Sequence, residues 1–345
     1  MPRPYRRKSQ RVHKLLRHLR IIFMGTPEFA LPALRALVEA VQVVLVVTRP
    51  DRPAGRGRRL SSPPVARFAR EHGLPLLQPP SLRSSEVVRA LAALQPDLLV
   101  TAAYGRIIPE EVLALPRLGA INAHPSLLPA YRGAAPVQRA IADGQAETGV
   151  TVLYQTAELD AGDIILQERV PIGPEETAGE LERRLAEVAA RLLLEAVRLI
   201  AEGRAPRRPQ DHSAATYVGR LRKEDGRIDW ARPAEEIARL VRAMDPWPSA
   251  YTFRGGRQVT VWRAQAVPQS PSAAGGEPGA VLDVSEEGIL IATGRGLLRL
   301  LEVQPAGGKR MTAAAFARGH RVRPGERWGG ADPGESATLW PGGGG

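Results

Sequence analysis

The sequence predicts a doubly wound α/β domain followed by a small antiparallel β-barrel domain. Short apolar runs rich in β-branched residues alternate with longer amphipathic stretches over residues 20–123. Beyond residue 249 the pattern changes to short strands separated by glycine-rich turns. The chain has 345 residues, and 43% are hydrophobic, so it is long enough for two domains with cores of their own.

Helix and strand signals follow one another in order through the first half of the chain. A short apolar run before the turn at Gly25 predicts the first strand, and an amphipathic stretch then predicts the first helix. Ser62 and Pro63 are typical of a helix N-cap and first turn, and Gly73 is typical of a helix stop. The expected strands are 21–24, 41–48, 74–77, 97–103 and 120–123, and the expected helices are 28–40, 62–72, 84–94 and 109–115.

The second half begins with two longer strand signals and one long helix signal. Residues 203–211 then contain three arginines and two prolines with little apolar content, which predicts a linker. One more helix precedes about five short strands, and an OB-like fold is one candidate for their barrel. The expected strands are 150–155, 163–170, 250–253, 258–265, 279–285, 288–293 and 296–304, and the expected helices are 175–202 and 233–244.

The amino-acid composition of the chain excludes several classes of protein. The chain has no cysteine, which excludes disulfides, thiolate nucleophiles and cysteine-based metal sites. No apolar stretch approaches the 18–20 residues, roughly, that span a bilayer, so no membrane segment is expected. The basic residues 1–19 lack the apolar run of a secretory signal, although an organellar transit peptide remains open. A cytoplasmic protein fits these features.

The formal net charge of +12 is concentrated in a few segments. Residues 1–20 carry +8, residues 49–59 carry +4 and residues 201–345 carry +5, whereas the rest of the chain is net acidic at −5. Local positive charge favours contact with a polyanion at selected points. The alternative is a general bias toward arginine, since only four of the 48 basic residues are lysine.

Asn122, His124 and Asp160 form the candidate catalytic set. Asn122 and His124 lie two apart at the carboxyl end of a predicted strand, so their side chains share one face of the sheet. The turn Leu159–Asp163 is able to bring Asp160 back toward them. Amide, imidazole and carboxylate together suit acid/base work and stabilisation of an oxyanion. A single histidine at a strand end is more often structural, and that alternative stays open.

The sequence lacks the motifs of several other common functional sites. The turn after the first strand has no G-x-G-x-x-G, and Pro27 removes a donor amide, which argues against a dinucleotide site. No P-loop motif occurs, and the six histidines show no metal spacing, so no metal is expected. Ser126 lies close to His124 without a nucleophile-elbow sequence, which argues against a hydrolase triad.

Two segments beside this edge of the sheet are candidates for binding. Ser126, Leu127, Leu128 and Pro129 form a rigid, apolar run that suits the wall of a site for a flat ligand. The loop at 49–59 carries five guanidinium groups on a glycine- and proline-rich scaffold, and arginine matches phosphates and guanine edges. A solvated flexible loop is the alternative for this second segment. The five arginines are Arg49, Arg52, Arg56, Arg58 and Arg59.

Six stretches together resemble the methionyl-tRNA formyltransferase family, and the resemblance covers residues 20–325. The Asn-x-His…Asp set with the Ser-Leu-Leu-Pro run marks the wider superfamily that uses 10-formyltetrahydrofolate. The arginine-rich loop and the C-terminal pattern narrow it to the tRNA enzymes. The matching stretches are RIIFMGTPEFA at 20–30, TRPDRPAGRGRRLSSPPV at 48–65, AAYGRIIP at 102–109, INAHPSLLPAYRGAAPVQRAI at 121–141, ETGVT…LDAGDI at 147–164 and LEVQPAGGKRMTAAAF at 301–316.

The resemblance implies a fold, an activity and partners. It implies a Rossmann-like formyltransferase domain and an OB-like tRNA-binding domain, and it implies formyl transfer from 10-formyltetrahydrofolate to the α-amino group of methionine on initiator tRNA. For this chain, the resemblance implies that Asn122, His124 and Asp160 are catalytic. It also implies that the run 126–129 lies along the folate site and that the arginine loop lies against the acceptor stem. The expected ranges are a basic extension at 1–19, a catalytic domain at 20–203, a linker at 204–222, a C-terminal domain at 223–322 and a tail at 323–345.

The chain departs from the family at Ala130, where relatives commonly carry a basic residue, and this leaves one phosphate or folate contact in doubt. In the expected mechanism Asn122 and His124 donate hydrogen bonds to an oxyanion, while Asp160 either orients His124 or takes a proton through water. The chain is expected to be a monomer. The competing functions are a formyltransferase acting on a nucleotide sugar or purine precursor, a formyltetrahydrofolate hydrolase, and an RNA-binding module without catalysis.

Overall fold

A computed structural model describes residues 15–54, 59–267 and 276–330. The chain divides into two compact units. The first takes its residues from Met1–Pro136, Glu147–Pro171 and Glu182–Gly219, and the second from Val137–Ala146, Ile172–Leu181 and Arg220–Gly345. In the described part of the chain, no helix is both long enough and apolar enough to span a membrane.

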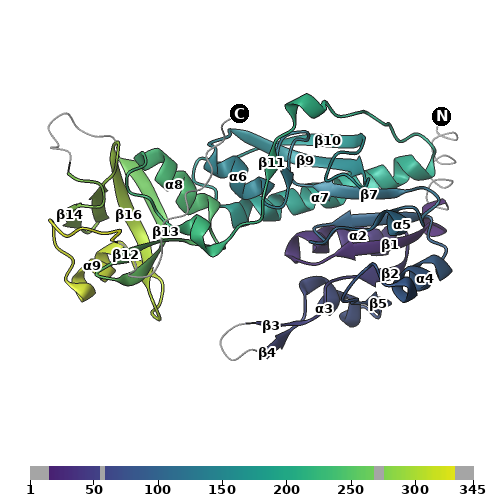
Figure 1. Ribbon diagram of the computed structural model, residues 1–345, viewed down its shortest axis with the longest axis horizontal. Coiled ribbons are helices and arrows are strands. Elements are labelled where there is room, and N and C mark those ends of the chain that lie inside the picture. The colour runs from purple at the N-terminus through teal and green to yellow at the C-terminus, as the bar shows by residue number, and fades with distance from the viewer. Residues whose placement is uncertain (1–14, 55–58, 268–275, 331–345) are drawn as a thin grey trace, which may run out of the picture. The chain divides into compact units, whose positions relative to one another are not determined.

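A seven-stranded sheet forms the centre of the first unit, with strand order β10-β9-β7-β6-β1-β2-β5 (Figure 1). From β1 the chain builds outward first through β2 and β5 and then, on the other side, through β6 and β7, which is the doubly wound arrangement. These five strands are parallel, whereas β9 runs antiparallel to β7 and β10 antiparallel to β9. The strands are β1 (Arg20–Gly25), β2 (Gln42–Val47), β5 (Leu76–Leu77), β6 (Leu98–Ala102), β7 (Ala120–His124), β9 (Glu147–Tyr154) and β10 (Ile164–Pro171).

Both faces of this sheet are covered, as the near-continuous apolar strands require. Ile22 and Met24 of β1 belong to a buried cluster with Leu91 of α4 and Val112 of α5. Phe23, between them, points to the opposite face and is also fully buried. The helices of this unit are η1 (Glu28–Ala30), α2 (Leu31–Ala40), α3 (Pro64–Glu71), α4 (Ser85–Ala93), α5 (Glu110–Leu113) and most of α7 (Ala178–Ala201), whereas α6 (Pro136–Ala142) falls almost wholly in the second unit.

Some local expectations were wrong. Ser62 does not cap a helix: α3 begins at Pro64 after Pro63 without a side-chain cap, and the Ser62 hydroxyl instead donates to Asp51 Oδ2 at 2.7 Å. The arginine loop contains a hairpin, β3 (Arg52–Ala54) and β4 (Arg59–Ser61), which the sequence did not indicate. The Ser62 hydroxyl therefore binds the Asp51 carboxylate, outside the helix, and does not cap the N-terminus of α3.

The second unit contains an antiparallel sheet with strand order β12-β13-β16-β15-β14, and β17 also pairs with β16. Val261, Ile289 and Leu300 are buried in it, and Phe316 of helix α9 is buried as well. The predicted class, an α/β domain followed by a small antiparallel β domain, is confirmed. The elements are η3 (Lys223–Gly226), α8 (Ala234–Ala243), β12 (Ala250–Arg254), β13 (Arg257–Val267), β14 (Val281–Ser285), β15 (Gly288–Ala292), β16 (Leu297–Pro305), β17 (Met311–Thr312) and α9 (Ala313–His320).

A substitution at Gly162 tests how tightly the turn between β9 and β10 is packed. A Cβ atom at Gly162 would overlap the backbone carbonyl of Tyr154, so the backbone would have to shift. Gly162→Ala is therefore expected to lower the free energy of unfolding by about 1–3 kcal/mol, measured by denaturant titration. Gly219→Ala is the matched control, because a Cβ at Gly219 meets nothing within 4 Å, and it should leave stability unchanged or slightly raised. Equal stability of the two variants would mean that the turn is loose.

Candidate active site

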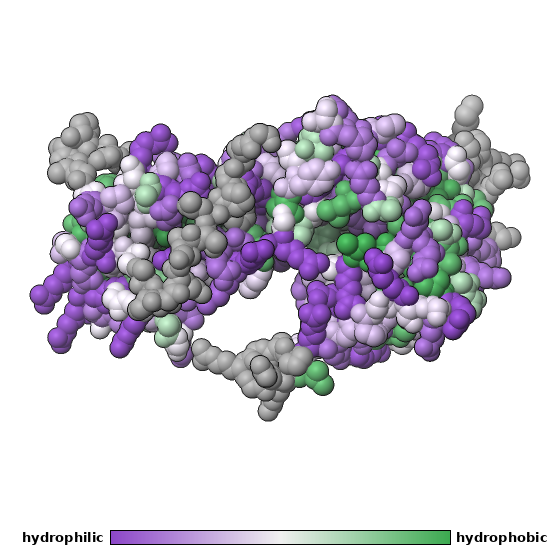
Figure 2. Space-filling model, viewed as in Figure 1, coloured by the Kyte–Doolittle hydropathy of each residue, from purple (hydrophilic) through white to green (hydrophobic). Residues whose placement is uncertain are grey.

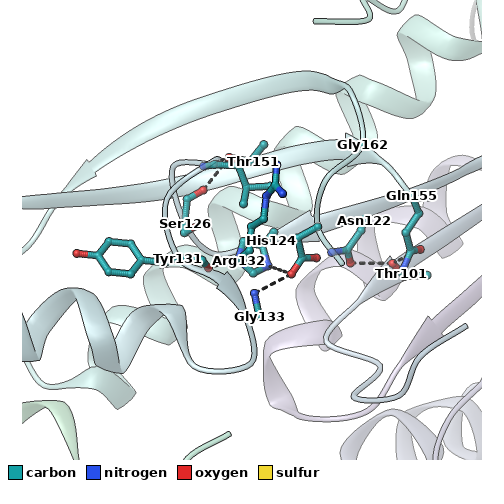
Figure 3. Close-up of polar contacts among 12 residues, drawn as sticks. Thr101, Asn122, His124, Ser126, Tyr131, Arg132, Gly133, Thr151, Gln155 and Gly162 are labelled. Carbon is teal, nitrogen blue, oxygen red and sulfur yellow. Dashed lines mark hydrogen bonds and ion pairs between the residues drawn. The ribbon is translucent and has the colours of Figure 1, made fainter. Parts of the chain in front are cut away.

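Strand β7 places Asn122 and His124 at the carboxyl end of the parallel strands. Asn122 lies opposite Thr101 of β6, and His124 lies opposite Thr151 of β9. The two side chains share a face because they are two residues apart on a strand. They lie at the edge where ligands bind in open α/β sheets, as the sequence predicted (Figure 3).

The ring of His124 is fixed by a hydrogen bond to the backbone. Its Nε2 lies 2.8 Å from the carbonyl oxygen of Tyr131, and the side chain is only about 5% exposed. A carbonyl oxygen can only accept, so the proton must lie on Nε2. Nδ1 is then the nitrogen left for chemistry, and it lies 3.6 Å from Asp160 Oδ2.

Asp160 lies in the turn between β9 and β10, and the turn holds its side chain and its backbone separately. Its φ of 50° is in the left-handed region, which aspartate tolerates better than most residues. Its carboxylate accepts a hydrogen bond from the backbone N–H of Gly133 at 2.9 Å. Its carbonyl accepts another from Gln210 Nε2 at 2.8 Å, and that nitrogen also donates to the carbonyl of Gly162. Asp160 is therefore fixed beside His124, although 36 residues separate them.

Arg132 and Gln210 support this turn, and neither was predicted from the sequence as a site residue. Arg132 is fully buried, and its Nη2 and Nε donate to Gln210 Oε1 at 2.9 and 3.3 Å. The guanidinium also contacts His212 and Tyr217, while its carboxylate contact, Glu158 Oε1, is 3.5 Å away. Gln210 thus accepts from Arg132 and donates to the Asp160 turn at the same time. An arginine inside a motif with mostly apolar neighbours was the available signal.

Residues 210–218, which the sequence assigned to a linker, brace the loop after β7. The Thr216 hydroxyl accepts a hydrogen bond from the N–H of Tyr131, and the Thr216 carbonyl accepts from the N–H of Arg132. Strand β11 (Tyr217–Val218) pairs in parallel with β8 (Arg132–Gly133). The carbonyl that holds His124 therefore belongs to a braced loop.

The run Ser126–Pro129 is mostly internal. Ser126 is fully buried, and its hydroxyl donates to the carbonyl of Ala130 at 2.7 Å. Leu128 is buried with Leu153 and Ile164, and its N–H donates to Thr151 Oγ1. Leu127 and Pro129 are half-buried. Ser126 and Leu128 therefore shape the loop from inside, and direct contact of this run with folate stays a prediction.

The arginine loop is anchored at its base. Gln78 and Ser62 donate hydrogen bonds to Asp51, and these bonds, helped by Arg70, hold the pKa of the Asp51 carboxyl below its usual value. Arg52 is exposed and Arg49 is half-buried. The positions of Arg56 and Arg58 and the side chain of Arg59 lie outside what the structure describes.

The surface near the site is mixed in character. Figure 2 shows apolar residues gathered in a hollow of the α/β unit, with polar residues around it. Several large apolar side chains of this unit are exposed, namely Leu60, Ile107 and Leu159. Among the described residues, no group of three or more His, Cys, Asp or Glu is placed to hold a metal ion.

Two family models match the chain in succession. The model for formyl transferases matches residues 19–197, and the model for the formyl transferase C-terminal domain matches residues 220–321.

Curated relatives match nearly the whole chain. A methionyl-tRNA formyltransferase of Moorella thermoacetica is 48% identical over 309 residues, which are 89% of this chain and 98% of that protein. One of Symbiobacterium thermophilum is 51% identical over 312 residues, which are 90% of this chain and 95% of that protein.

Solved structures share the fold at low sequence identity. HypX from Aquifex aeolicus in complex with tetrahydrofolic acid has a TM-score of 0.60 at 22% identity, over 87% of this chain and only about half, 47%, of HypX. The sugar 3N-formyl transferase WlaRD has a TM-score of 0.60 at 16% identity, over 82% of this chain and 97% of that one. At 45–51% identity over about nine-tenths of its length with relatives of one name, the chain belongs to the methionyl-tRNA formyltransferase family.

Proposed function

We propose that this enzyme transfers the formyl group of 10-formyltetrahydrofolate to the α-amino group of methionine on initiator tRNA, giving N-formylmethionyl-tRNA for translation initiation. The observation that carries the proposal is the meeting of Asn122, His124 and Asp160 at the carboxyl edge of the sheet, in a chain of this family. Acyl transfer between two nitrogens needs an oxyanion stabiliser and a group that takes a proton. An amide, an imidazole and a carboxylate supply both without a metal.

Asn122 is suited to hold the developing oxyanion. Its Oδ1 accepts a hydrogen bond from the Thr101 hydroxyl at 2.7 Å, which leaves the Nδ2 hydrogens as its available donors. Such a donor lowers the barrier only if it is already oriented when charge develops on the formyl oxygen.

His124 exchanges protons through Nδ1, because Nε2 is committed to the Tyr131 carbonyl. A protonated Nδ1 can donate to the oxyanion. A bare Nδ1 can take the proton that the attacking amine loses and return it to the tetrahydrofolate nitrogen, which leaves when its bond to the formyl carbon breaks. The Asp160 carboxylate oxygen Oδ2 lies 3.6 Å from Nδ1. Asp160 then acts mainly as the electrostatic partner of His124, since its own Oδ2 is held by Gly133.

The binding assignments follow from the same edge of the sheet. Folate lies along the loop that contains Ser126, Leu127, Leu128 and Pro129, and the acceptor stem of tRNA lies against the loop with Arg49, Arg52, Arg56, Arg58 and Arg59. The exposed Arg52 and the anchored base of the hairpin β3–β4 support the second assignment. The enzyme acts in the cytoplasm as a monomer.

The choice of acceptor tests the proposal directly. Formyl transfer from 10-formyltetrahydrofolate is expected with charged initiator tRNA, but not with charged elongator tRNA, a nucleotide sugar or water. Asn122→Ala is expected to reduce single-turnover transfer by about 100- to 1,000-fold, as for other oxyanion donors. Transfer to a small acceptor alone would overturn the assignment of substrate, and near-normal transfer by Asn122→Ala would overturn the assignment of the site.

If the arginine loop binds tRNA, its arginines contribute to the salt dependence of tRNA binding. Replacing Arg56 and Arg58 by alanine is expected to weaken tRNA binding and to flatten its dependence on salt, because two phosphate contacts are lost. Folate binding should stay unchanged. Arg117→Ala is the matched control, since Arg117 precedes β7 at the opposite edge of the sheet. If folate affinity fell as much as tRNA affinity in the double variant, the loop would serve the folate pocket instead.

Gln210→Glu separates the two roles of Gln210. The variant keeps an acceptor for Arg132 but loses the N–H donors to the carbonyls of Asp160 and Gly162. Stability should hold, because the buried guanidinium gains a counter-ion, while single-turnover transfer should fall by about tenfold as the Asp160 turn loosens. Denaturant titration and rapid-quench kinetics measure the two effects. Full activity in this variant would show that the turn needs no such support.

A further inference from the structure

Two uncharged residues that the family motifs do not include lie behind Asn122. Thr101 is on β6, directly across from Asn122 on β7, and Gln155 directly follows β9. Thr101 is 1% exposed, so its hydroxyl is out of reach of substrates and solvent. Figure 3 shows the three side chains in a row, with Thr101 between the two amides.

The Thr101 hydroxyl has more acceptors than it has protons. Its oxygen lies 2.7 Å from Asn122 Oδ1, 3.1 Å from Gln155 Oε1 and 3.2 Å from the carbonyl of Ile121. A hydroxyl donates one hydrogen bond and accepts up to two, so the shortest contact, to Asn122, takes the proton. The Gln155 amide, turned by 180° about its last bond, then presents Nε2 to the Thr101 oxygen and donates to it.

With the Gln155 amide turned in this way, the row has a single direction: Gln155 donates to Thr101, and Thr101 donates to Asn122 Oδ1. Each donation polarises the next group, and the row ends at the amide that faces the reacting atoms. Among the residues that the structure describes, Asn122 Nδ2 has no hydrogen-bond acceptor, and Asn122 itself is partly exposed. The free end of the row is thus an open N–H donor.

We infer that Thr101 is a positioning residue for formyl transfer, which fixes the Asn122 amide so that Nδ2, and not Oδ1, faces the oxyanion. Without that hydroxyl the two ends of the amide have nearly the same shape and no contact in this row that distinguishes them. An amide turned the wrong way presents an oxygen to an oxyanion and repels it. Gln155 acts one step further back by orienting Thr101. The inference rests on the proposed role of Asn122.

Thr101→Val and Thr101→Ser test the inference as a pair. Valine keeps the shape of threonine and removes the hydroxyl, whereas serine keeps the hydroxyl. Thr101→Val is expected to reduce the single-turnover rate by about 10- to 100-fold, with KM for folate and tRNA nearly unchanged. The single-turnover rate of Thr101→Ser should stay within about threefold of that of the parent, because serine keeps the hydroxyl. If packing of the side chain were the cause, serine, which loses the methyl group, would reduce the rate more than valine does.

A double-variant cycle separates this inference from the proposed function. If Thr101 acts through Asn122, adding Thr101→Val to Asn122→Ala causes no further loss. An additional 10-fold or greater loss, or full activity in Thr101→Val, would overturn the positioning role. Should Asn122→Ala itself retain normal transfer, the catalytic assignment of Asn122 fails, and the inference fails with it. Equal melting temperatures of Thr101→Val and the parent show that the fold is intact.

Discussion

The hydrogen bond between His124 Nε2 and the carbonyl of Tyr131 decides what the rest of the site can do. It removes one ring nitrogen from chemistry, sets the tautomer and turns Nδ1 toward Asp160. The carbonyl is placed by a residue in the left-handed region, Tyr131 at φ 60°, whose N–H is held by Thr216. A histidine at a strand end, which is structural in most proteins, thereby acquires a single reactive nitrogen beside a carboxylate.

The site depends on three stretches that are far apart in the sequence. The loop after β7 supplies the Tyr131 carbonyl and the Gly133 N–H, and the turn after β9 supplies Asp160. The stretch 210–218 holds both, through Gln210 on the turn and Thr216 on the loop. Arg132 links them because it is buried and must satisfy its donors within reach. The proposed catalytic groups are therefore positioned largely by neutral hydrogen bonds from backbone and amides.

Periodicity was enough to predict the strands of the sheet, and a spacing of two on β7 was enough to predict that Asn122 and His124 share a face. The partners of these residues were beyond sequence reasoning. Gln210 meets Arg132 across 78 residues, and Thr101 meets Gln155 across 54, so no local pattern connects them. Ser62 shows the same limit, since its long-range contact with Asp51 replaced the expected cap. Local signals predict elements, whereas the choice among hydrogen-bond partners depends on the finished fold.

In the proposed reaction, Nδ1 of His124, and not Nε2, exchanges the proton. Long-range ¹H–¹⁵N correlation spectra of the protein with labelled histidine, assigned with a His124→Gln variant, report which ring nitrogen carries hydrogen. We expect Nε2 of His124 to carry hydrogen at neutral pH and Asp160→Asn to shift the Nδ1 resonance. A ring with hydrogen on Nδ1 and a bare Nε2 at neutral pH would contradict it.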